Sequence, residues 1–467
     1  MTTQRPAGLA GAGLAGELAE IVGGDHVRTD AGALETFARD ATPLHRATPD
    51  AICFPGETRE VAAVIELAAE RGIPVVPRGS GTNLCAATVP HRGGIVLSLT
   101  RMNRLLELDA ANMVAVCQPG VITARLGEAA AERGLLYPPD PGSRATSTIA
   151  GNVATCAGGL RGLKYGVTRD YVLGCEVVIG TGETLRCGGK LVKDVAGLDL
   201  TRLLCGSEGT LGVITELTVR LVPAAAANAT GVAYFSDLAD AGRAVSQILA
   251  AGVLPVTLEF LDHTCLETVE EFAGIGLRTD AGALLIFGQD GAAEAIAGDM
   301  SAMAEACAQN NGFGVEIADS DADAQELLEA RRAVLPSLSR RAPLTILEDA
   351  SVPRARLAEM VQRIDAIAAE HDLLIGTFGH AGDGNLHPTC VVDPAQDGVL
   401  QRVEQAFAQI FAAALELGGT ISGEHGIGLA KRDHLRSQLG DAHMRLLTRL
   451  KAAFDPADIL NPGKLAS

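Results

Sequence analysis

The chain has no tryptophan, and aromatic residues make up only 3% of its 467 residues. Basic residues are also few: 38 Lys and Arg stand against 57 Asp and Glu, which gives a formal net charge of −19 at pH 7. A nucleic-acid-binding protein needs a basic surface that displaces counterions from phosphates. The charge balance therefore argues against nucleic acid as a partner, although a small anion can still bind where the local charge is positive.

Paired cysteines and long apolar runs are absent as well. The ten cysteines lie singly from Cys53 to Cys390, and no C-x-x-C pair occurs, which argues against a zinc ribbon or a ferredoxin-type cluster. Isolated cysteines in a long chain are typical of reduced thiols in the cytosol. The first residues lack the order of a signal peptide, and no uncharged run reaches membrane-spanning length. We expect a cytoplasmic protein and leave open a peripheral association with the inner membrane.

Small and apolar residues are plentiful. Glycine occurs 54 times and hydrophobic residues make up 47% of the chain, and a chain of this length is expected to form two or more domains. Residues 58–84 predict one helix and one strand, with Thr58 as the N-cap, Gly72 at the helix end and IPVVP as a buried strand. The helix would bury Val61, Val64, Ile65 and Ala68. The second half of 199–223 alternates like a half-exposed strand.

The decapeptide GHAGDGNLHP at 379–388 brackets a turn with two histidines. Two imidazole nitrogens that bind the same metal ion lie roughly 3 Å apart. The seven residue steps from His380 to His387 would span about 23 Å in a fully extended chain. The segment must therefore bend if both are to bind one ion, and Gly382, Asp383 and Gly384 suit a turn.

A second glycine-rich segment, Ser422–Gly426, adds Glu424 and His425. Two imidazoles and one carboxylate with open positions are typical of a catalytic metal site, and the remaining histidine could then act as a general base. The alternative, polar loop residues held by backbone hydrogen bonds, stays open from the residue pattern alone.

Two further glycine-rich segments suit phosphate. The first is Pro77–Asn83, where glycine amides, a hydroxyl and Arg78 are close in sequence. The second covers 141–159, PGSRATSTIAGNVATCAGG. Each could be an ordinary tight loop, but together they can hold the two halves of a pyrophosphate cofactor.

Six ordered segments resemble one family: PRGSGTNL, STIAGNVATCAGG, CGSEGTLGVIT, GHAGDGNLHP, SGEHGIG and FDPADILNPGK. Across roughly residues 45–464 the chain is similar to the FAD-linked 2-hydroxyacid dehydrogenases of the vanillyl-alcohol oxidase superfamily, which include glycolate oxidase flavin subunits, D-lactate dehydrogenases and D-2-hydroxyglutarate dehydrogenases. The resemblance implies an α+β fold with a two-subdomain FAD-binding domain at 1–225 (core from about 45). It also implies an α+β cap domain at 226–418 and a C-terminal segment at 419–467 that returns to FAD.

The resemblance also implies the cofactor contacts. Some relatives attach FAD covalently through a histidine in the first loop, where this chain has Thr82, so we expect non-covalent FAD. The implied contacts are Pro77, Arg78, Gly79, Ser80, Gly81, Thr82, Asn83, Pro141, Gly142, Ser143, Thr148, Gly151, Asn152, Thr155, Glu208, Gly209, Ile214 and Asn461.

For the chemistry, the resemblance implies a divalent metal, with zinc, manganese and iron all open, bound by His380, His387 and Glu424. His425 would be the base, and a metal on the substrate hydroxyl lowers the pKa of that hydroxyl. Arg331 would bind the substrate carboxylate, the alternative being an arginine on a helix surface.

The expected substrate is a small D-2-hydroxy acid such as D-lactate or glycolate. D-2-hydroxyglutarate enzymes typically carry a lysine near the segment TILEDASVP, where this chain has Leu347 and Glu348. The alternatives are a D-2-hydroxyglutarate dehydrogenase, an alcohol or sugar oxidase sharing the FAD domain, and a metal-storing or scaffold protein. The electron acceptor is open between a quinone, a cytochrome, an electron-transfer flavoprotein and an iron–sulfur subunit, and a homodimer is left open too.

Overall fold

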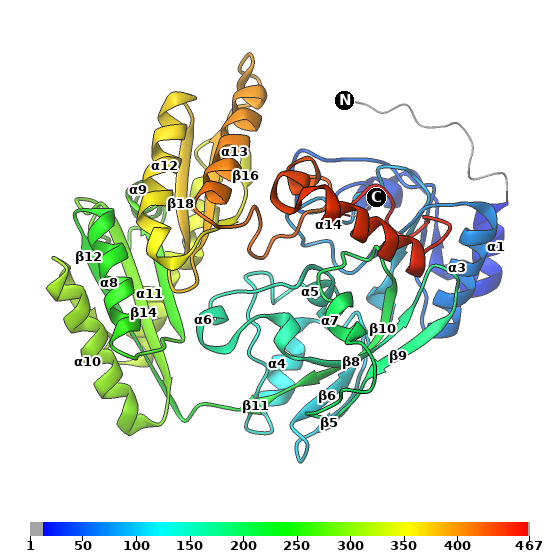
Figure 1. Ribbon diagram of the computed structural model, residues 1–467, viewed down its shortest axis with the longest axis horizontal. Coiled ribbons are helices and arrows are strands. Elements are labelled where there is room, and N and C mark those ends of the chain that lie inside the picture. The colour runs from blue at the N-terminus through cyan, green and yellow to red at the C-terminus, as the bar shows by residue number, and fades with distance from the viewer. Residues whose placement is uncertain (1–12, 466–467) are drawn as a thin grey trace. The chain divides into compact units, whose positions relative to one another are not determined.

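The structure is a computed structural model that describes residues 13–465 (Figure 1). It divides into two compact units. Unit 1 comprises Met1–Ala157, Val167–Ala224 and Glu424–Ser467, within the described range, and unit 2 comprises Gly158–Gly166 and Ala225–Gly423. The chain therefore passes from unit 1 to unit 2 and back, and Glu424 is the first residue after the return.

Unit 1 begins with a small sheet in the order β1-β2-β4-β3, in which β4 runs parallel to both β2 and β3. Its strands are β1 (Val27–Arg28), β2 (Ala51–Cys53), β3 (Val75–Arg78) and β4 (Ile95–Ser98), and its helices are α1 (Leu14–Val22), α2 (Ala31–Thr36) and α3 (Thr58–Arg71). The predicted apolar face of α3 is buried, and Gly72 ends the helix in the left-handed conformation, φ 62°. Glycine adopts this conformation without the steric cost of a Cβ.

The predicted N-cap at Thr58 is wrong. Helix α3 begins at this residue, its cap position is Glu57, and no side chain caps it. The Thr58 hydroxyl donates instead to Glu176 at 2.6 Å. A buried carboxylate needs donors more than a partly exposed helix end does, because the helix end can use water.

The second sheet of unit 1 is antiparallel, in the order β5-β6-β10-β8-β9. Its strands are β5 (Leu105–Asp109), β6 (Val114–Cys117), β8 (Val172–Val178), β9 (Thr184–Gly188) and β10 (Val213–Arg220). A separate pair joins β7 (Leu135–Leu136) to β11 (Val222–Pro223). The remaining helices of unit 1 are α4 (Thr123–Ala131), α5 (Ile149–Thr155), α7 (Leu200–Leu204) and α14 (Arg432–Phe454), which is kinked at Gly440.

Strand β10 is not half-exposed as its alternation predicts. All its residues are buried except Glu216 and Arg220, which are intermediate. It is the central strand of its sheet, with β6 and β8 on either side, so even its threonines are covered. Polar residues that alternate in a sequence can therefore face packed layers rather than water.

Unit 2 is built on one antiparallel sheet of eight strands in the order β15-β12-β14-β13-β18-β19-β16, with β17 also paired to β19. The strands are β12 (Ala227–Phe235), β13 (Thr257–Asp262), β14 (Ala283–Gly291), β15 (Phe313–Ile317), β16 (Leu344–Leu347), β17 (Ala350–Ser351), β18 (Leu374–His380) and β19 (Asn385–Val392). The short helix α6 (Gly162–Tyr165), inserted from the first part of the chain, belongs to this unit.

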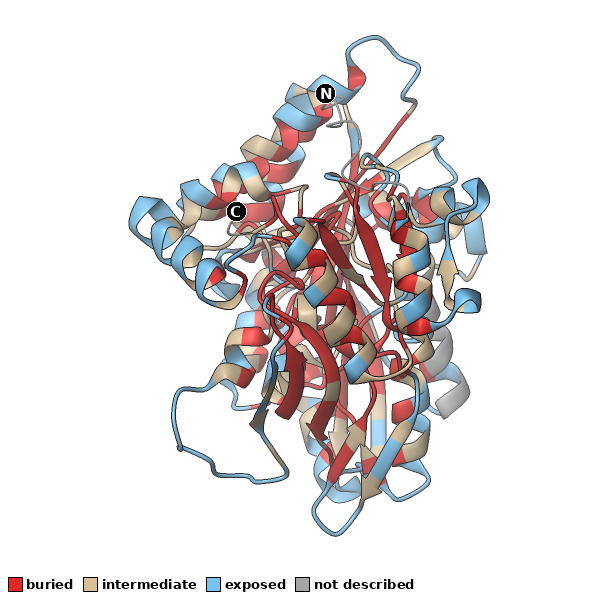
Figure 2. Cartoon of the chain, turned by 90° about the vertical axis from the view of Figure 1, so that its right-hand side faces the viewer, coloured by how far each residue is buried: buried red, intermediate tan, exposed pale blue. Residues whose placement is uncertain are grey.

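Helices cover both faces of this sheet. Helices α8 (Leu238–Ala250), α10 (Ala293–Gln309) and α12 (Leu357–Glu370) pack on it and on one another, and α12 also contacts α13 (Val399–Glu416). Helices α9 (His263–Ala273) and α11 (Asp321–Leu338) form the other layer. In Figure 2, which brings the elements of unit 1 to the front, strands are mostly buried and helices are exposed on their outer sides. In α13, apolar residues that recur at helical spacing are buried: Val403, Phe407, Ile410, Phe411 and Ala414.

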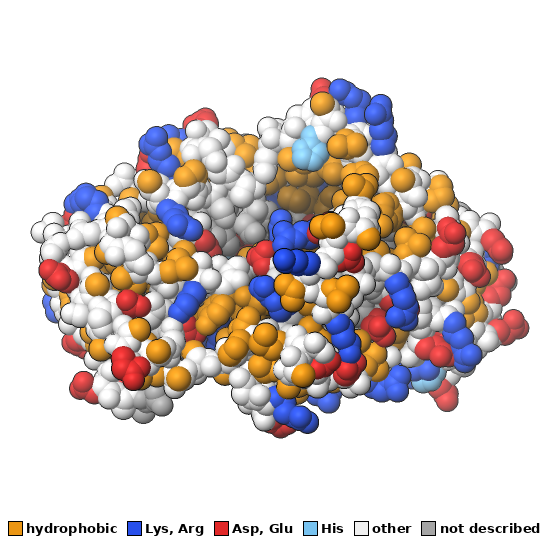
Figure 3. Space-filling model, turned by 60° about the horizontal axis from the view of Figure 1, so that its bottom comes forward, with side chains coloured by type: hydrophobic (Ala, Val, Ile, Leu, Met, Phe, Trp, Pro, Cys, Tyr) orange, Lys and Arg blue, Asp and Glu red, His pale blue; other side chains and the backbone are white. Residues whose placement is uncertain are grey.

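The surface carries charges of both signs. On the face drawn in Figure 3, acidic and basic side chains lie among hydrophobic ones. Among the residues that the structure describes, no helix combines the length and the apolar character needed to cross a bilayer.

Candidate metal and flavin site

The two histidines of the decapeptide lie on a β-hairpin in unit 2. His380 ends β18 and His387 lies in β19, and these strands pair so that Phe378 faces His387 and His380 faces Asn385. The chain therefore bends as the sequence predicts. Gly384 makes the turn with φ 83°, and a Cβ on it would lie 2.1 Å from the carbonyl oxygen of Val352. Only glycine fits there.

The hairpin register brings both imidazoles to the same face of the sheet. Side chains alternate along a strand, so His387 and the diagonal residue His380 point the same way. Their ring centres are 5.2 Å apart and the rings are perpendicular. Phe378 flanks His387, with its ring centre 5.4 Å away. Both histidines are buried.

The residues that directly precede Glu424 are tied to the same unit as the hairpin. Asp349 accepts hydrogen bonds from the Ser422 hydroxyl at 3.1 Å and from the Gly423 N–H at 2.7 Å. A Cβ on Gly423 would lie 2.3 Å from Oγ of Ser351 and 2.5 Å from Oδ1 of Asn385. The chain thus passes tightly against the hairpin turn just before Glu424.

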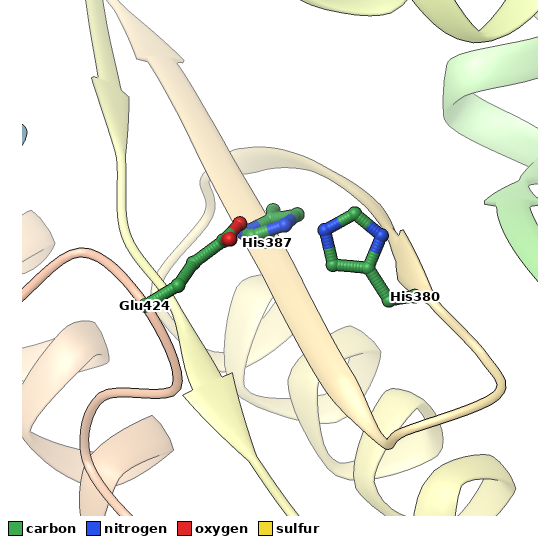
Figure 4. A group of neighbouring side chains, drawn as sticks. All are labelled: His380, His387 and Glu424. Atoms are coloured by element: carbon green, nitrogen blue, oxygen red, sulfur yellow. The ribbon is translucent and has the colours of Figure 1, made fainter. Parts of the chain in front are cut away.

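Figure 4 shows His380, His387 and Glu424 directed toward one another, and their ligand atoms lie within 4.8 Å of one another. Two imidazole nitrogens and a carboxylate oxygen are ligands that zinc, manganese and iron accept. A shared ion requires ligand atoms roughly 3 Å apart. Three protein ligands leave a position for water or substrate, so the donor set fits a catalytic divalent metal.

A residue that sequence reasoning missed, Glu259, lies beside this group. It is fully buried in β13, where it faces His380 across the strand pair. Its Oε1 is 2.7 Å from Nδ1 of His380, and its Oε2 accepts from Nε of Arg331 at 2.7 Å. Burial alone would raise the pKa of Glu259, but the charges and hydrogen bonds of His380 and Arg331 outweigh it and lower the pKa.

Arg331 comes from α11 and is held at two points. Its Nε binds Glu259, and its guanidinium carbon lies 4.5 Å from the centre of the Phe378 ring. Within the described part of the chain, its terminal Nη atoms have no hydrogen-bond acceptor. The two Nη atoms of Arg331 are therefore available for an anion, whereas its Nε is fixed by Glu259.

His425 follows Glu424 and is buried. With Glu348 and Asp349 it forms a second group whose ligand atoms lie within 4.8 Å of one another.

The first glycine-rich loop of unit 1, Pro77–Asn83, packs against the second. A Cβ on Gly79 would lie 2.0 Å from Oγ1 of Thr148, and the Ser80 hydroxyl donates to the carbonyl oxygen of Thr146 at 2.6 Å. No protein acceptor for the amide N–H groups of 79–82 is found among the residues that the structure describes. Unpaired amides in a glycine-rich loop can bind phosphate oxygens.

The Arg78 side chain at the start of this loop is held by residues outside the loop. Its guanidinium donates to the Arg39 carbonyl oxygen at 2.8 Å and to Thr88 at 3.2 Å, and it lies over the Phe37 ring. Asn83 organises the end of the loop, because its Oδ1 accepts from the N–H groups of Cys85 and Ala87.

The second loop and helix α5 carry several further expected cofactor contacts. Thr148 precedes α5, and the buried Asn152 donates to Oγ1 of Thr123 at 2.7 Å. The expected contacts that lie before α5 are Pro141, Gly142 and Ser143. The expected contacts that lie within α5 also include Gly151 and Thr155.

Glu208 and Asn461 are tied to protein groups. Glu208 accepts from the N–H groups of Ile427 and Gly428 at 2.7 and 2.8 Å, and burial raises its pKa. Asn461 donates to the Glu208 carbonyl oxygen at 2.7 Å. Gly209 has φ 71° and contacts Pro77, and Ile214 is buried in β10. These residues join the C-terminal segment to the first loop of unit 1.

Comparisons with known proteins identify both parts of the chain. The family model for the C-terminal domain of FAD linked oxidases matches residues 224–465, and the FAD binding domain model matches 49–188. The glycolate oxidase subunit GlcD of Bacillus subtilis is 51% identical, over 92% of this chain and 91% of its own length. D-lactate dehydrogenase of Anaerostipes hadrus is 38% identical over 92% of both chains. D-2-hydroxyglutarate dehydrogenase of Stutzerimonas stutzeri is 33% identical over 96% and 98%.

Solved structures confirm the predicted fold. p-Cresol methylhydroxylase matches with a TM-score of 0.80 at 16% identity, covering 97% of this chain and 96% of that one. 4-Ethylphenol oxidase from Gulosibacter chungangensis matches with a TM-score of 0.79 at 20% identity, covering 99% and 98%. The architecture is thus an FAD-binding domain with a cap domain, and by its family matches and relatives the chain belongs to the FAD-linked 2-hydroxyacid dehydrogenases, which are flavoprotein oxidoreductases.

Proposed function

We propose that this chain is an FAD- and divalent-metal-dependent dehydrogenase that oxidises a small D-2-hydroxy acid, of the D-lactate or glycolate type, to the 2-oxo acid. One observation carries the proposal: the donor group His380, His387 and Glu424 lies next to an arginine whose terminal nitrogens are available. A 2-hydroxy acid has a hydroxyl and a carboxylate on neighbouring carbons. A metal site beside a guanidinium suits both groups at once.

The metal would be held by His380, His387 and Glu424, and when bound it supplies a Lewis acid that lowers the pKa of the substrate hydroxyl. Arg331 binds the substrate carboxylate through its two Nη atoms, which fixes the orientation of C2. His425 is the base that takes the hydroxyl proton, and Glu348 and Asp349 lie beside it.

FAD would lie on unit 1 and supplies the acceptor for the hydride from C2 when bound. The amides of 79–82 suit its pyrophosphate, and the close contact between Gly79 and Thr148 supports a cradle formed by both loops. Thr82 offers no nucleophile of the kind that an imidazole provides, so we propose non-covalent attachment.

Glu348 supports a monocarboxylate substrate. It directly follows β16, is buried, and its N–H donates to the carbonyl oxygen of Pro388, the neighbour of His387. A second substrate carboxylate near this position would meet the Glu348 carboxyl group rather than a cation. D-2-hydroxyglutarate remains the second candidate because of the relative that bears that name.

Reduced FAD must pass its electrons to an acceptor. With no C-x-x-C pair, the chain offers no conventional cluster motif of its own for an iron–sulfur relay. The Bacillus relative is named as a subunit, which supports a partner protein as acceptor. A quinone, a cytochrome and an electron-transfer flavoprotein are the other acceptors to test.

The test is anaerobic flavin reduction. The purified protein, loaded with Zn²⁺, Mn²⁺ or Fe²⁺ in turn, is mixed with single enantiomers of 2-hydroxy acids while the visible flavin band is recorded. Bleaching by D-lactate or glycolate, lost after chelation and restored by metal, is expected. Bleaching by D-2-hydroxyglutarate alone would overturn the substrate proposal. Bleaching that survives complete metal removal would overturn the metal requirement.

A further inference from the structure

Glu259 joins the proposed metal ligand to the proposed substrate arginine. It is a fully buried carboxylate in a sheet of hydrophobic strands, and its neighbours Leu258 and Phe260 are buried as well. A buried carboxylate is costly unless charged or hydrogen-bonding groups pair with it. Each of its two oxygens has one such partner, His380 on Oε1 and Arg331 on Oε2, both at 2.7 Å.

These contacts close a ring of five side chains on one face of the sheet. Glu259 binds His380, the His380 ring lies edge-on to that of His387, and Phe378 lies between His387 and Arg331. Arg331 returns to Glu259. Because each member contacts the next, the orientation of the imidazole and that of the guanidinium depend on the same carboxylate.

From this geometry we infer that Glu259 is a positioning residue: it holds His380 with the proton on Nδ1, so that Nε2 carries the lone pair for the metal, and it holds Arg331 by Nε, so that its Nη pair can bind the substrate carboxylate. The inference rests on the proposed function of the site. A hydrogen bond from the second nitrogen of a ligating histidine fixes its tautomer and raises its basicity.

The substitution Glu259→Gln separates this role from packing. Glutamine has the same shape but replaces one acceptor oxygen with an NH₂ donor. If the NH₂ faces Arg331, two donors oppose each other. If it faces His380, the imidazole can accept only by moving its proton to Nε2, which removes the lone pair that a metal needs. In the first arrangement the Nδ1–H of His380 donates to a neutral amide oxygen instead of a carboxylate, which lowers the basicity of Nε2. Both arrangements therefore weaken metal binding, and the first also disturbs Arg331.

A matched control lies in the same strand. Asp262 is also a buried carboxylate of β13, but it accepts from the backbone N–H groups of Cys265 and Thr377 and not from the site. Asp262→Asn replaces a second buried carboxyl group of the same strand by an amide. It leaves the Glu259 contacts intact.

The experiment measures Co²⁺ binding to FAD-loaded, chelator-stripped protein by the visible Co²⁺ bands, for wild type, Glu259→Gln and Asp262→Asn. We expect a 10- to 100-fold weaker Co²⁺ affinity for Glu259→Gln, with wild-type FAD content, and wild-type Co²⁺ affinity for Asp262→Asn. Equal losses in both variants, or no loss in Glu259→Gln, would overturn the inference while leaving the proposed function standing. A wild-type protein that binds no Co²⁺ would overturn both.

A second variant tests the inference independently, in case Glu259→Gln does not fold. Glu259→Ala leaves a space between His380 and Arg331 that formate can enter, and formate supplies two acceptor oxygens. We expect millimolar formate to restore most of the Co²⁺ affinity in Glu259→Ala and to leave Asp262→Asn unchanged. Wild-type affinity of Glu259→Ala without formate would overturn the inference.

Discussion

The buried carboxylate of Asp349 accepts a hydrogen bond from the backbone N–H of Gly423 at 2.7 Å. This contact joins the end of the β16–β17 segment to the residue just before Glu424, and the Ser422 hydroxyl donates to the same carboxylate. The proposed carboxylate ligand of the metal is thus held through its backbone. Its position depends on Asp349, a residue of the segment TILEDASVP for which the sequence alone predicts no role.

Asp349→Ala is expected to loosen the segment around Glu424. It leaves the Gly423 N–H without its buried acceptor, which costs about 1–3 kcal/mol of unfolding free energy, and we expect lower metal occupancy at equal FAD content. Urea unfolding and metal analysis measure the two effects. Ser422→Ala, which removes only the hydroxyl donor, should change both far less, and a larger loss in Ser422→Ala would contradict this role of Asp349.

Gly384→Ala should damage the hairpin that carries both histidines. A Cβ there would lie 2.1 Å from the Val352 carbonyl oxygen, and φ is 83°, a conformation that costs an L-residue at least about 1 kcal/mol before any clash. We expect a lower unfolding midpoint and a marked loss of bound metal. Gly398→Ala is the control, because Gly398 also has positive φ but nothing within 4 Å. Retained metal in Gly384→Ala would show that the turn tolerates rearrangement.

Gly79→Ala tests the FAD cradle. The added Cβ would lie 2.0 Å from Oγ1 of Thr148, so the Thr148 side chain or the loop backbone must shift. We expect purified Gly79→Ala to carry less FAD, measured as the ratio of visible to ultraviolet absorbance. Gly127→Ala, in helix α4 with nothing within 4 Å, should keep full FAD, since alanine favours a helix. Equal FAD content in both variants would place the pyrophosphate elsewhere.

Arg331→Lys keeps the positive charge near Glu259 but loses the planar fork. We expect KM for the 2-hydroxy acid to rise by about 10- to 100-fold, equivalent to about 1.4–2.7 kcal/mol of binding, with a smaller change in kcat and unchanged metal content. Steady-state kinetics with a fixed acceptor measures the split. A large fall in kcat at unchanged KM would assign Arg331 to the chemical step rather than to substrate binding.

Asp262 should make stability depend on pH. Burial raises its pKa from 3.8 to about 7, despite the hydrogen bonds from Cys265 and Thr377 that lower it. The folded protein then binds more protons than the unfolded chain between these values, so this group stabilises at low pH and its contribution is lost as pH rises toward 7. Urea unfolding at pH 5 and pH 8 should show the advantage of wild type over Asp262→Asn shrinking at pH 8. A growing advantage would mean that the carboxylate form is the stabilised one.

Much of the local structure follows from residue spacing. The buried faces of α3 and α13 lie where apolar residues recur at helical intervals, and Gly72 ends α3 as expected. These features depend on contacts within a few residues. The burial of β10 depends on the strands on either side of it. The Thr58 hydroxyl donates to Glu176, which is far away in the sequence. No local sequence pattern shows either contact.

The sequence likewise predicts some residues of the candidate site and not others. The sequence alone supplied the imidazoles, the Glu424 carboxylate and the glycines that let the chain turn at 382–384, because these are properties of residue types. Glu259 was hidden because an acid between Leu258 and Phe260 looks like the solvent-facing position of an alternating strand.

Only the pairing of β13 with β18 places Glu259 opposite His380, and only the packing of α11 brings Arg331 to the same carboxylate. Strand register and helix packing join residues that lie far apart in the sequence. The tertiary structure therefore decided which nitrogen of His380 faces a carboxylate and which guanidinium nitrogens of Arg331 remain available, because those choices depend on the hydrogen-bond partner across the sheet.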